Sequence, residues 1–573
     1  LRGGSRRRRE HTTQGPRSTV RTGLLRAFDT VRAMDTSALA APPRPPLALR
    51  AAHALLPLCA GLGLLSGCRA PDPSFELGLT ATGRAAVACI DPHAARIGAE
   101  TLAAGGNAVD AAVATAFALA VSWPPAGNLG GGGFLVLAAP DGTRAALDFR
   151  ETAPAAVTAE HFLDEQGQYD AALVDDPWHN VGVPGTVAGL GLAHARFGRL
   201  PWRDVVEPAR RLAAEGLVVT DELAYWLDTY ADELAAIPAS RAVFLPHGHT
   251  PRAGEIWRQP DLARTPQAVR DGGPRAFYTG PIAAAVAADC QAHGHPLTLA
   301  DLAAYEPRQR APLRTSYAGH EVVGMPPPSS GGVAVAQLLG LADRWDTRSH
   351  PAGSAAAEHR LAEAARRAFA ERAAVAGDPD FTDIPVAASL DEEHLDALAA
   401  SFSESATPSA SVNLPAAVEG DQTTHLSVMD ADGLTVACTV TLEAAFGGKA
   451  VAAGTGVLLN NELRDFNRVP GTTDASGLIG TRANLPGPGK RPLSSMSPTV
   501  VVDPSGIPVL ATGSPGGRTI INTVARVVLR RVGRGMPLRE AVELPRSHHQ
   551  WLPDRFDLEP SARADELAEA LRA

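Results

Sequence analysis

A threonine-rich stretch in the last third of the chain carries the residues best suited to chemistry. The segment Thr423-Thr424-His425-Leu426-Ser427-Val428 alternates between polar and apolar side chains, which predicts a strand. A threonine hydroxyl needs a base beside it to become a nucleophile, and a free α-amino group on the same residue can be that base. The strand can therefore be interpreted as a buried N-terminus that chain cleavage releases, with Thr423 as the nucleophile. An ordinary threonine-rich strand is the alternative that these residues alone leave open.

The strand at 423–428 is predicted to pair with a second strand at 434–442, after the polar turn Asp430-Ala431-Asp432-Gly433. If residues 431–433 form the loop and Gly433 adopts the left-handed conformation, Thr423 lies directly opposite Thr441. Two threonine hydroxyls then meet at the end of a hairpin. The same register leaves one face apolar, through the pairs Leu426 with Cys438 and Val428 with Val436.

Length and composition predict a large protein with a sizeable core. The chain has 573 residues, of which 45% are hydrophobic and 20% charged, and its formal net charge is −10. No basic stripe occurs beyond the first residues, so nucleic acid is not an expected partner. Helical patterns dominate residues 186–236, 281–304 and 354–376, and strand patterns predominate after residue 423. Periodicity therefore favours an α/β or α+β fold.

The N-terminal region has the pattern of a targeting signal. Residues 1–33 contain an arginine run and no methionine before Met34, and we expect them to be disordered or an upstream mis-extension. Residues 34–67 then resemble a bacterial lipoprotein signal peptide, because a short apolar run ends in Leu65-Ser66-Gly67 before Cys68. We expect lipid attachment at Cys68, a membrane anchored through that lipid and a periplasmic or other extracytoplasmic location. Plain secretion and an uncleaved membrane anchor remain the alternatives.

A series of short sequence words resembles the γ-glutamyltranspeptidases (glutathione hydrolases), a family of N-terminal nucleophile hydrolases. The words occur in the family's order over most of the chain, whereas a single glycine-rich word would be a weak signal. They are GGNAVDAAVA at 105–114, GGGGF at 130–134, DFRETAP at 148–154, GVPGTVAGL at 182–190, PPPSSGG at 326–332, AEAARRAFAER at 362–372, GDPDF at 377–381, TTHLSV at 423–428, NNELRDF at 460–466, PLSSMSPT at 492–499, GSPGG at 513–517 and HHQWLPD at 548–554.

The resemblance implies an α+β fold, the four-layer αββα sandwich of N-terminal nucleophile hydrolases. It also implies one precursor that cuts itself between Gln422 and Thr423 into a large subunit, residues 68–422, and a small catalytic subunit, residues 423–573. The Ser-, Ala- and Pro-rich segment 403–422 is the expected flexible approach to that bond. Because family members continue for further strands beyond the position of Ala573, we expect the C-terminus to be truncated.

The resemblance also assigns roles around the expected nucleophile. Thr441 would orient the Thr423 hydroxyl, and backbone N–H groups of Gly516 and Gly517 would stabilise the oxyanion. A γ-glutamyl group carries an α-carboxylate and an α-ammonium, which need donors at one end of the site and carboxylates at the other. The implied carboxylate-binding residues are Arg150, Ser494 and Ser495, and the implied ammonium-binding residues are Glu462 and Asp465.

Two departures from the family pattern affect the expected activity. Glu443 replaces an asparagine that contacts the α-amino group in well-known members, which makes the pocket more acidic. In the loop between Asp465 and Arg491, small residues near Ser476 replace an aromatic side chain of some bacterial members. Water should enter more easily, so we expect hydrolysis to exceed transfer to an amino acid or peptide acceptor.

The function that the resemblance implies is cleavage of glutathione and related γ-glutamyl compounds, without a cofactor. We expect no metal, because His548 and His549 are adjacent and lack the spacing of ligands. A phosphate-binding or dinucleotide-binding loop is not predicted either, since GNLGGGG does not have the required order. Two alternatives remain, a cephalosporin or glutaryl acylase of the same fold and a non-catalytic envelope lipoprotein.

Overall fold

Two β-sheets, each antiparallel throughout, form the centre of the protein. The computed structural model describes residues 79–82, 85–412, 422–471 and 480–572. The larger sheet has seven strands in the order β1 (Leu79–Thr82), β2 (Ala85–Ala88), β10 (Gln422–Met429), β11 (Thr435–Glu443), β3 (Gly132–Ala138), β4 (Arg144–Asp148) and β7 (Arg308–Arg310). The smaller sheet has four strands in the order β15 (Pro508–Thr512), β14 (Thr499–Val502), β9 (His320–Gly324) and β8 (Leu313–Tyr317).

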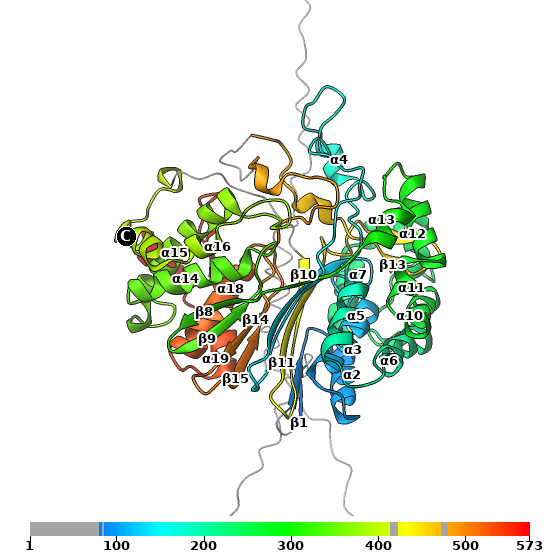
Figure 1. Cartoon of the computed structure of the whole chain (residues 1–573), viewed down its shortest axis with the longest axis horizontal. Helices are drawn as coiled ribbons and strands as arrows, with labels where there is room; N and C mark the ends of the chain where they lie inside the picture. The colour runs from blue at the N-terminus through cyan, green and yellow to red at the C-terminus, as the bar shows by residue number, and fades with distance from the viewer. Residues whose placement is uncertain (1–78, 83–84, 413–421, 472–479, 573) are drawn as a thin grey trace, which may run out of the picture.

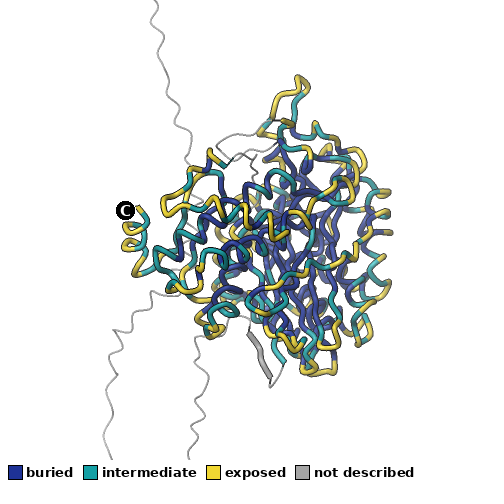
Figure 2. The backbone as a smooth tube through the Cα atoms, turned by 60° about the vertical axis from the view of Figure 1, so that its left-hand side comes forward, coloured by how far each residue is buried: buried dark blue, intermediate teal, exposed yellow. Residues whose placement is uncertain are grey.

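The two sheets pack face to face. Phe134, Val136 and Ala437 of the larger sheet share one buried hydrophobic cluster with Val323 and Val500 of the smaller sheet. Burial of this apolar surface holds the layers together, at about 25 cal/mol per Å² removed from water. Figure 2 shows that the buried residues concentrate in this interior, whereas the exposed residues lie mainly on the outer helices and loops.

Helices cover the outer face of each sheet (Figure 1). The larger sheet is covered by α2 (Pro92–Ala103), α3 (Ala108–Ser122) and α5 (Thr186–Phe197), and α6 (Trp202–Glu215) packs on α3. The smaller sheet is covered by α14 (Gly331–Arg344), α15 (Ala355–Val375) and α18 (Thr519–Val528). The order helix, sheet, sheet, helix is the four-layer αββα sandwich expected from the sequence words. The other α-helices of the described residues are α4 (Ala171–Asp175), α7 (Asp221–Thr229), α8 (Ala231–Ala236), α9 (Pro238–Phe244), α10 (Pro260–Gly272), α11 (Arg275–Tyr278), α12 (Pro281–Ala292), α13 (Leu299–Ala304), α16 (Val386–Ser389), α17 (Glu392–Ala400), α19 (Leu538–Glu543) and α20 (Ala564–Arg572). Two further helical segments are η5 (Glu462–Asp465) and η7 (Leu529–Gly533). The short strands are β5 (Leu217–Val218), β6 (Ile256–Trp257), β12 (Val451–Ala452), β13 (Val457–Leu458), β16 (Ser547–His548) and β17 (Asp557–Leu558).

The central helix α3 shows why small residues were needed in this layer. Asn107 and Asp110 form a capping box at its N-terminus, and each of its residues is buried. A Cβ atom at Gly98 of α2 would lie 2.3 Å from the Thr115 hydroxyl, so the glycine permits the close packing of α2 on α3. The alanine-rich sequence of α3 therefore lets a helix lie tightly between the sheet and its neighbours.

The three predicted helical regions are confirmed by α5 to α8, by α12 with α13, and by α15. The prediction that strands predominate after residue 423 is correct only as far as β15. Beyond it the chain forms α18, η7, α19 and α20 with only the two-residue strands β16 and β17. Helix α18 repeats apolar residues at helical spacing, through Ile520, Ile521, Val524, Ala525 and Val528, and this pattern decides its conformation.

The predicted hairpin is confirmed in its register. Strand β10 pairs with β11 so that Thr423 lies opposite Thr441, and the pairs Leu426 with Cys438 and Val428 with Val436 follow. Gly433 in the loop has φ of 89°, the left-handed conformation that the prediction required. The register shifts between Gln422 and Thr423, because Gln422 lies opposite Glu443 and no residue of β10 lies opposite Leu442. This β-bulge falls at the peptide bond that is expected to be cut.

Some predictions concern residues outside the described ranges. These are the N-terminal region 1–33, the signal peptide 34–67, the lipidation site Cys68, the segment 413–421 before the cleavage site and the loop residues near Ser476. Among the residues that are described, none of the helices combines the length and apolar character needed to cross a lipid bilayer.

Candidate active site

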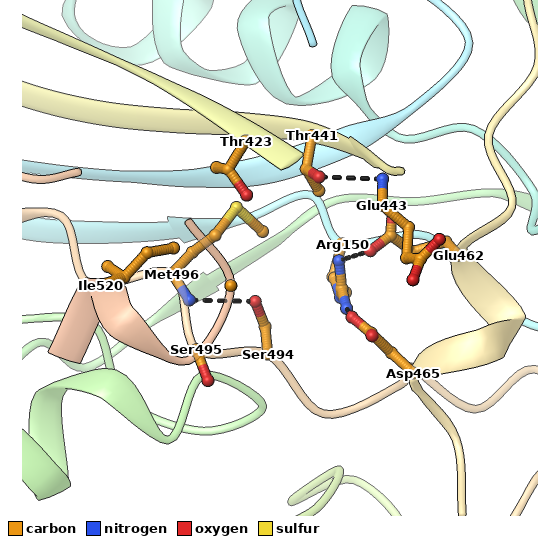
Figure 3. A pocket seen from close by; sticks show the side chains of 11 residues that line it. Arg150, Thr423, Thr441, Glu443, Glu462, Asp465, Ser494, Ser495, Met496 and Ile520 are labelled. Carbon is orange, nitrogen blue, oxygen red and sulfur yellow. Dashed lines mark hydrogen bonds and ion pairs between the residues drawn. The ribbon is translucent and has the colours of Figure 1, made fainter. Parts of the chain in front are cut away.

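A cavity lies at the end of the β10–β11 hairpin and gathers residues that are far apart in the sequence (Figure 3). Its volume is about 240 Å³, including the part open to solvent. The residues that line it come from the ends of β4, β10 and β11, from η5, from the loop before β14 and from the start of α18. They are Arg150, Thr423, Thr441, Glu443, Glu462, Asp465, Ser494, Ser495, Met496, Gly517 and Ile520.

The structure thus brings together the residues predicted as nucleophile and as ligands of a γ-glutamyl group. Gln422 and Gly516 do not line the cavity but adjoin Thr423 and Gly517, which do. The apolar residues Met496 and Ile520 were not predicted, although Met496 lies within the word PLSSMSPT. Figure 3 shows the Thr423 side chain beside Met496, at the opposite side of the cavity from Asp465.

The Thr441 hydroxyl contacts the peptide bond that precedes the expected nucleophile. Thr441 Oγ1 donates a hydrogen bond of 2.8 Å to the carbonyl oxygen of Gln422 and accepts one of 2.9 Å from the backbone N–H of Glu443. The family resemblance implies instead that Thr441 orients the Thr423 hydroxyl. In the uncut chain the Gln422 carbonyl is present and is a strong acceptor, so it takes the proton of Thr441.

Two glycines shape the turn between β15 and α18. Gly516 has φ of 113° and Gly517 has φ of 54°, conformations that side chains other than glycine rarely adopt. A Cβ atom at Gly516 would also lie 2.4 Å from the Thr519 hydroxyl. Upstream in the same turn, Gly513 packs against the His425 ring, since a Cβ atom there would lie 2.2 Å from its Nδ1. The turn therefore brings backbone N–H groups to the start of a helix, where a developing negative charge is favoured.

Arg150 is fully buried and is held by a dense set of acceptors. Its guanidinium donates to the carboxylates of Glu462 and Asp465 and to the backbone oxygens of Pro492 and Leu493. Burial alone lowers the pKa of Arg150, but the neighbouring carboxylates outweigh it and raise that pKa above its ordinary value. Arg150 therefore stays charged, and its charge is balanced by the two carboxylates predicted to bind an ammonium group.

The ammonium end of the cavity is rich in buried carboxylates. Burial raises the pKa of Glu443 to about 7 and the pKa of Glu462 well above its ordinary value. Glu443 accepts a hydrogen bond from the Asn461 side chain and lies 3.8 Å from the Arg464 guanidinium. Its φ of 79° is unusual for a residue other than glycine, and such strain is concentrated at functional sites.

Glu151 is a further buried carboxylate that the sequence reasoning missed, although it belongs to the word DFRETAP. It lies 3.7 Å from Arg150, its oxygens have no hydrogen-bond donor among the described residues, and burial raises its pKa to about 7. A Cβ atom at Gly132 would lie 2.4 Å from one of these oxygens, which explains a glycine in the GGGGF word. The cluster of Glu151, Glu462 and Asp465 around one arginine favours an additional positive charge from a ligand.

The serine end of the cavity is held by hydrogen bonds to neighbouring loops. Ser494 Oγ accepts a bond of 3.2 Å from the backbone N–H of Met496, and the Ser494 carbonyl accepts bonds of 2.8 Å from both the backbone N–H and the hydroxyl of Ser330. Ser495 Oγ accepts a bond of 3.1 Å from Arg372 of α15. Arg372 was not singled out from the sequence either, although it ends the word AEAARRAFAER.

The histidines considered as ligands are engaged elsewhere. His548 Nδ1 pairs with the Asn522 side chain at 2.8 Å, and His549 Nε2 lies 3.3 Å from Asp554. Within the described ranges, no group of three or more His, Cys, Asp or Glu side chains could hold a metal ion.

Known proteins are similar to this chain in sequence and in fold. The sequence model of the family described as Gamma-glutamyltranspeptidase matches residues 94–573. The glutathione hydrolase proenzyme of Escherichia coli (strain K12) is 43% identical over 485 residues, which are 84% of this chain and 83% of that protein.

Two solved structures show the same N-terminal nucleophile fold. The cephalosporin acylase from Bacillus halodurans superposes with a TM-score of 0.76 at 26% identity, covering 89% of this chain and 91% of that one. The gamma-glutamyltranspeptidase of Helicobacter pylori superposes with a TM-score of 0.55 at 35% identity, covering 59% of this chain and 96% of that one. Because the family model and the Escherichia coli relative both match most of its length, this chain belongs to the gamma-glutamyltranspeptidase family.

Proposed function

We propose that this chain is a self-cleaving γ-glutamyl hydrolase and transferase that acts on glutathione and related compounds, with Thr423 as its N-terminal nucleophile. The position of Thr423 is the observation that carries the proposal. Thr423 lies at a β-bulge and lines the cavity, and the carbonyl oxygen of the preceding residue, Gln422, accepts a hydrogen bond from the Thr441 hydroxyl. Family membership and the glutathione hydrolases among the relatives support the substrate.

Maturation begins with attack of the Thr423 hydroxyl on the Gln422 carbonyl carbon. The new C–O bond forms as the C–N bond breaks, the hydroxyl proton passes to the leaving nitrogen, and an ester joins the two segments. Thr441 already donates to the carbonyl oxygen, so it stabilises the negative charge that develops there. Water then hydrolyses the ester and leaves a large subunit, residues 68–422, and a small subunit that begins at Thr423.

Catalysis uses the α-amino group that this cut exposes. An α-amino group has an ordinary pKa of about 7.7–8.0, so near neutral pH a useful fraction is uncharged and accepts the Thr423 hydroxyl proton. The hydroxyl oxygen attacks the γ-carbonyl carbon, backbone N–H groups of Gly516 and Gly517 stabilise the oxyanion, and the leaving amine takes the proton. Water or an amino acid or peptide amine then attacks the γ-glutamyl ester and regenerates Thr423.

Substrate recognition exchanges the two internal ion pairs of Arg150 for ion pairs with the ligand. In this structure Arg150 pairs with Glu462 and Asp465. An α-amino acid end supplies a carboxylate for Arg150, Ser494 and Ser495 and an ammonium group for Glu443, Glu462 and Asp465. The ligand can thus replace each partner by a group of the same charge, which keeps the buried charges compensated.

An acylase with the same nucleophile is the second candidate, because the fold is closely similar to that of a cephalosporin acylase. A glutaryl group has no ammonium, so the buried carboxylates of Glu443 and Glu462 would gain no positive charge from it. We expect L-γ-glutamyl-p-nitroanilide to be cleaved at least about 100-fold more efficiently than glutaryl-p-nitroanilide, since one lost charged contact costs about 1.5–3 kcal/mol and more than one is lost. A preference for the glutaryl compound would establish the acylase.

For location, we infer an extracytoplasmic lipoprotein anchored through Cys68. The support is the sequence Leu65-Ser66-Gly67-Cys68 after an apolar run that follows arginines. Growth of cells with labelled palmitate should label the wild-type chain and leave a Cys68→Ser variant unlabelled. Label that persists in the variant would place the lipid elsewhere.

The decisive experiment is intact mass measurement and N-terminal sequencing of the purified chain beside a Thr423→Ala variant. We expect a fragment that begins at Thr423 in the wild type and a single uncut chain in the variant. Uncut chains in both would contradict the proposal and favour a non-catalytic envelope protein. Cleavage in both would assign the cut to another residue or to a protease.

A further inference from the structure

Asn461 is the residue directly before η5, and it is buried beside the ammonium end of the cavity. It forms hydrogen bonds with three consecutive residues where β11 ends. Its backbone N–H donates to the carbonyl oxygen of Leu442 at 3.1 Å, and its side-chain Nδ2 donates to Glu443 Oε2. Its Oδ1 accepts a bond of 3.1 Å from the backbone N–H of Ala444. One residue therefore joins the end of β11 to η5.

The bond to Ala444 decides which way the Asn461 amide faces. A backbone N–H can only donate, so the Asn461 atom beside it must be the amide oxygen, and the NH2 group must point to Glu443. The Arg464 guanidinium lies at the same carboxylate oxygen, Oε2, at 3.8 Å. Within the described residues Glu443 Oε1 accepts no hydrogen bond, and Glu443 lines the cavity. Oε2 is thus held by the protein, whereas Oε1 is available to a cation in the cavity.

The backbone of Glu443 depends on the same support. Its φ of 79° is costly for a residue that carries a Cβ atom, and it directly follows Leu442, which no residue of β10 lies opposite. The bonds from Asn461 hold the residues on both sides of this strained position. Asn461 therefore fixes the backbone of Glu443 as well as its carboxylate.

We propose that Asn461 is a positioning residue that turns one carboxylate oxygen of Glu443 towards the α-ammonium group of the γ-glutamyl substrate. The proposal rests on the proposed function, because it assigns this end of the cavity to that ammonium group. Asn461 itself does not line the cavity. Its contribution therefore passes through residue 443 and depends on which atom of that side chain it holds.

The test reverses the direction of the bond between positions 461 and 443. In Glu443→Gln, Asn461 holds the new amide oxygen, so the NH2 group at position 443 faces the cavity and opposes an ammonium group. In the double variant Glu443→Gln/Asn461→Asp, the carboxylate at position 461 accepts from that NH2 group and from the backbone N–H of Ala444. The amide oxygen at position 443 then faces the cavity and can accept from the substrate.

The measurement is KM and kcat for L-γ-glutamyl-p-nitroanilide on enzyme shown by mass to begin at Thr423. We expect Glu443→Gln and Asn461→Ala each to raise KM about 10-fold, with little change in kcat, because a contact to the ground-state substrate is weakened. Adding Asn461→Asp to Glu443→Gln should lower KM again by about 3-fold or more, although it is a second substitution. A KM that does not fall in the double variant, or a loss in Asn461→Ala confined to kcat, would overturn the proposal.

Two controls separate orientation from added charge and from a general effect of substitution. In a Glu443→Ala background no amide can be turned, so Asn461→Asp should give a smaller recovery there, and an equal recovery would assign the effect to charge alone and refute the proposal. Asn107→Asp is the matched control. Asn107 is likewise buried, accepts from backbone N–H groups at the start of α3, donates to the Phe197 carbonyl oxygen and does not line the cavity, so its KM should equal that of the wild type.

The double variant also protects the test against loss of folding. It retains all three bonds to residues 442–444, so it should mature, and failure to do so would contradict the proposal. If Asn461→Ala alone fails to mature, the comparison of the double variant with Glu443→Gln decides the question. If the wild type matures but does not cleave the compound, the proposed function fails instead.

Discussion

Thr441 and Gln422 are joined by a hydrogen bond of 2.8 Å that runs from the Thr441 hydroxyl to the carbonyl oxygen of Gln422. The bond spans the β-bulge at the end of the hairpin, where Leu442 has no opposite residue on β10. It places a donor on the one carbonyl whose carbon the Thr423 hydroxyl would attack. The uncut chain therefore already has a preorganised group for the charge that forms during maturation.

Removal of this hydroxyl should slow self-cleavage. We expect Thr441→Ala to reduce the rate of maturation about 10²–10³-fold, the usual effect of losing one oxyanion donor, and Thr441→Ser to retain most of it. The measurement is the fraction of small subunit against time, followed by intact mass. Thr435→Ala at the other end of β11 is the control and should mature normally. Equal rates for Thr441→Ala and the wild type would show that the bond has no part in the cut.

Substitution of Gly516 should reduce turnover more than substrate binding. We expect Gly516→Ala to lower kcat about 10²-fold or more, because the alanine cannot easily keep φ of 113° and its Cβ meets the Thr519 hydroxyl. The readout is kcat with L-γ-glutamyl-p-nitroanilide on matured enzyme. Gly506→Ala is the matched control, since Gly506 has φ of 90° with open space around it. The same loss in both variants would indicate a general cost of folding.

Glu443 should give ligand binding a pH dependence. Its pKa is raised to about 7 by burial, so it gains negative charge as the pH rises through that value. L-Glutamate, measured as a competitive inhibitor, should therefore bind more tightly at pH 8 than at pH 6. Glu443→Gln should flatten this dependence in part, because Glu151 and Glu462 also titrate with raised pKa values. An unchanged slope in the variant would exclude Glu443 as the titrating group.

Buried histidines should make the protein sensitive to acid. Burial lowers the pKa of His161 to about 3 and that of His295 to about 4, against an ordinary value of about 6.5. Below pH 6.5 the unfolded chain binds protons that the folded chain excludes, so each imidazole lowers the free energy of unfolding by at most about 1.4 kcal/mol per pH unit. This loss continues until the pH reaches the folded-state pKa.

The check is urea unfolding of the uncut Thr423→Ala chain between pH 7 and pH 5. His161→Gln should reduce the slope of stability against pH, and the exposed His247→Gln should not. A slope that is equal in the two variants would mean that His161 is accessible to protons in the folded state.

The sequence predicts the hairpin because local rules determine it, whereas most of the other cavity residues were implied by the resemblance to the family. Strand alternation and a single left-handed glycine suffice to place Thr423 opposite Thr441. The role of Thr441 could not be predicted in the same way, because its partner depends on whether the bond after Gln422 is intact. The contact of Arg372 with Ser495 could not be predicted, because only the fold brings α15 and the loop before β14 together from distant parts of the sequence.

The position of β10 in the larger sheet has a consequence for the matured protein. On one side β10 pairs with β2, and on the other side of the hairpin β11 pairs with β3 (Figure 1). Strand β14 likewise pairs with β9 in the smaller sheet. A cut before Thr423 would leave two polypeptides whose strands interleave in the larger sheet and pair with each other through β14 and β9 in the smaller one. Neither could dissociate without breaking these ladders and opening the core, so dilution should leave the pair together and the two polypeptides should unfold as one cooperative unit.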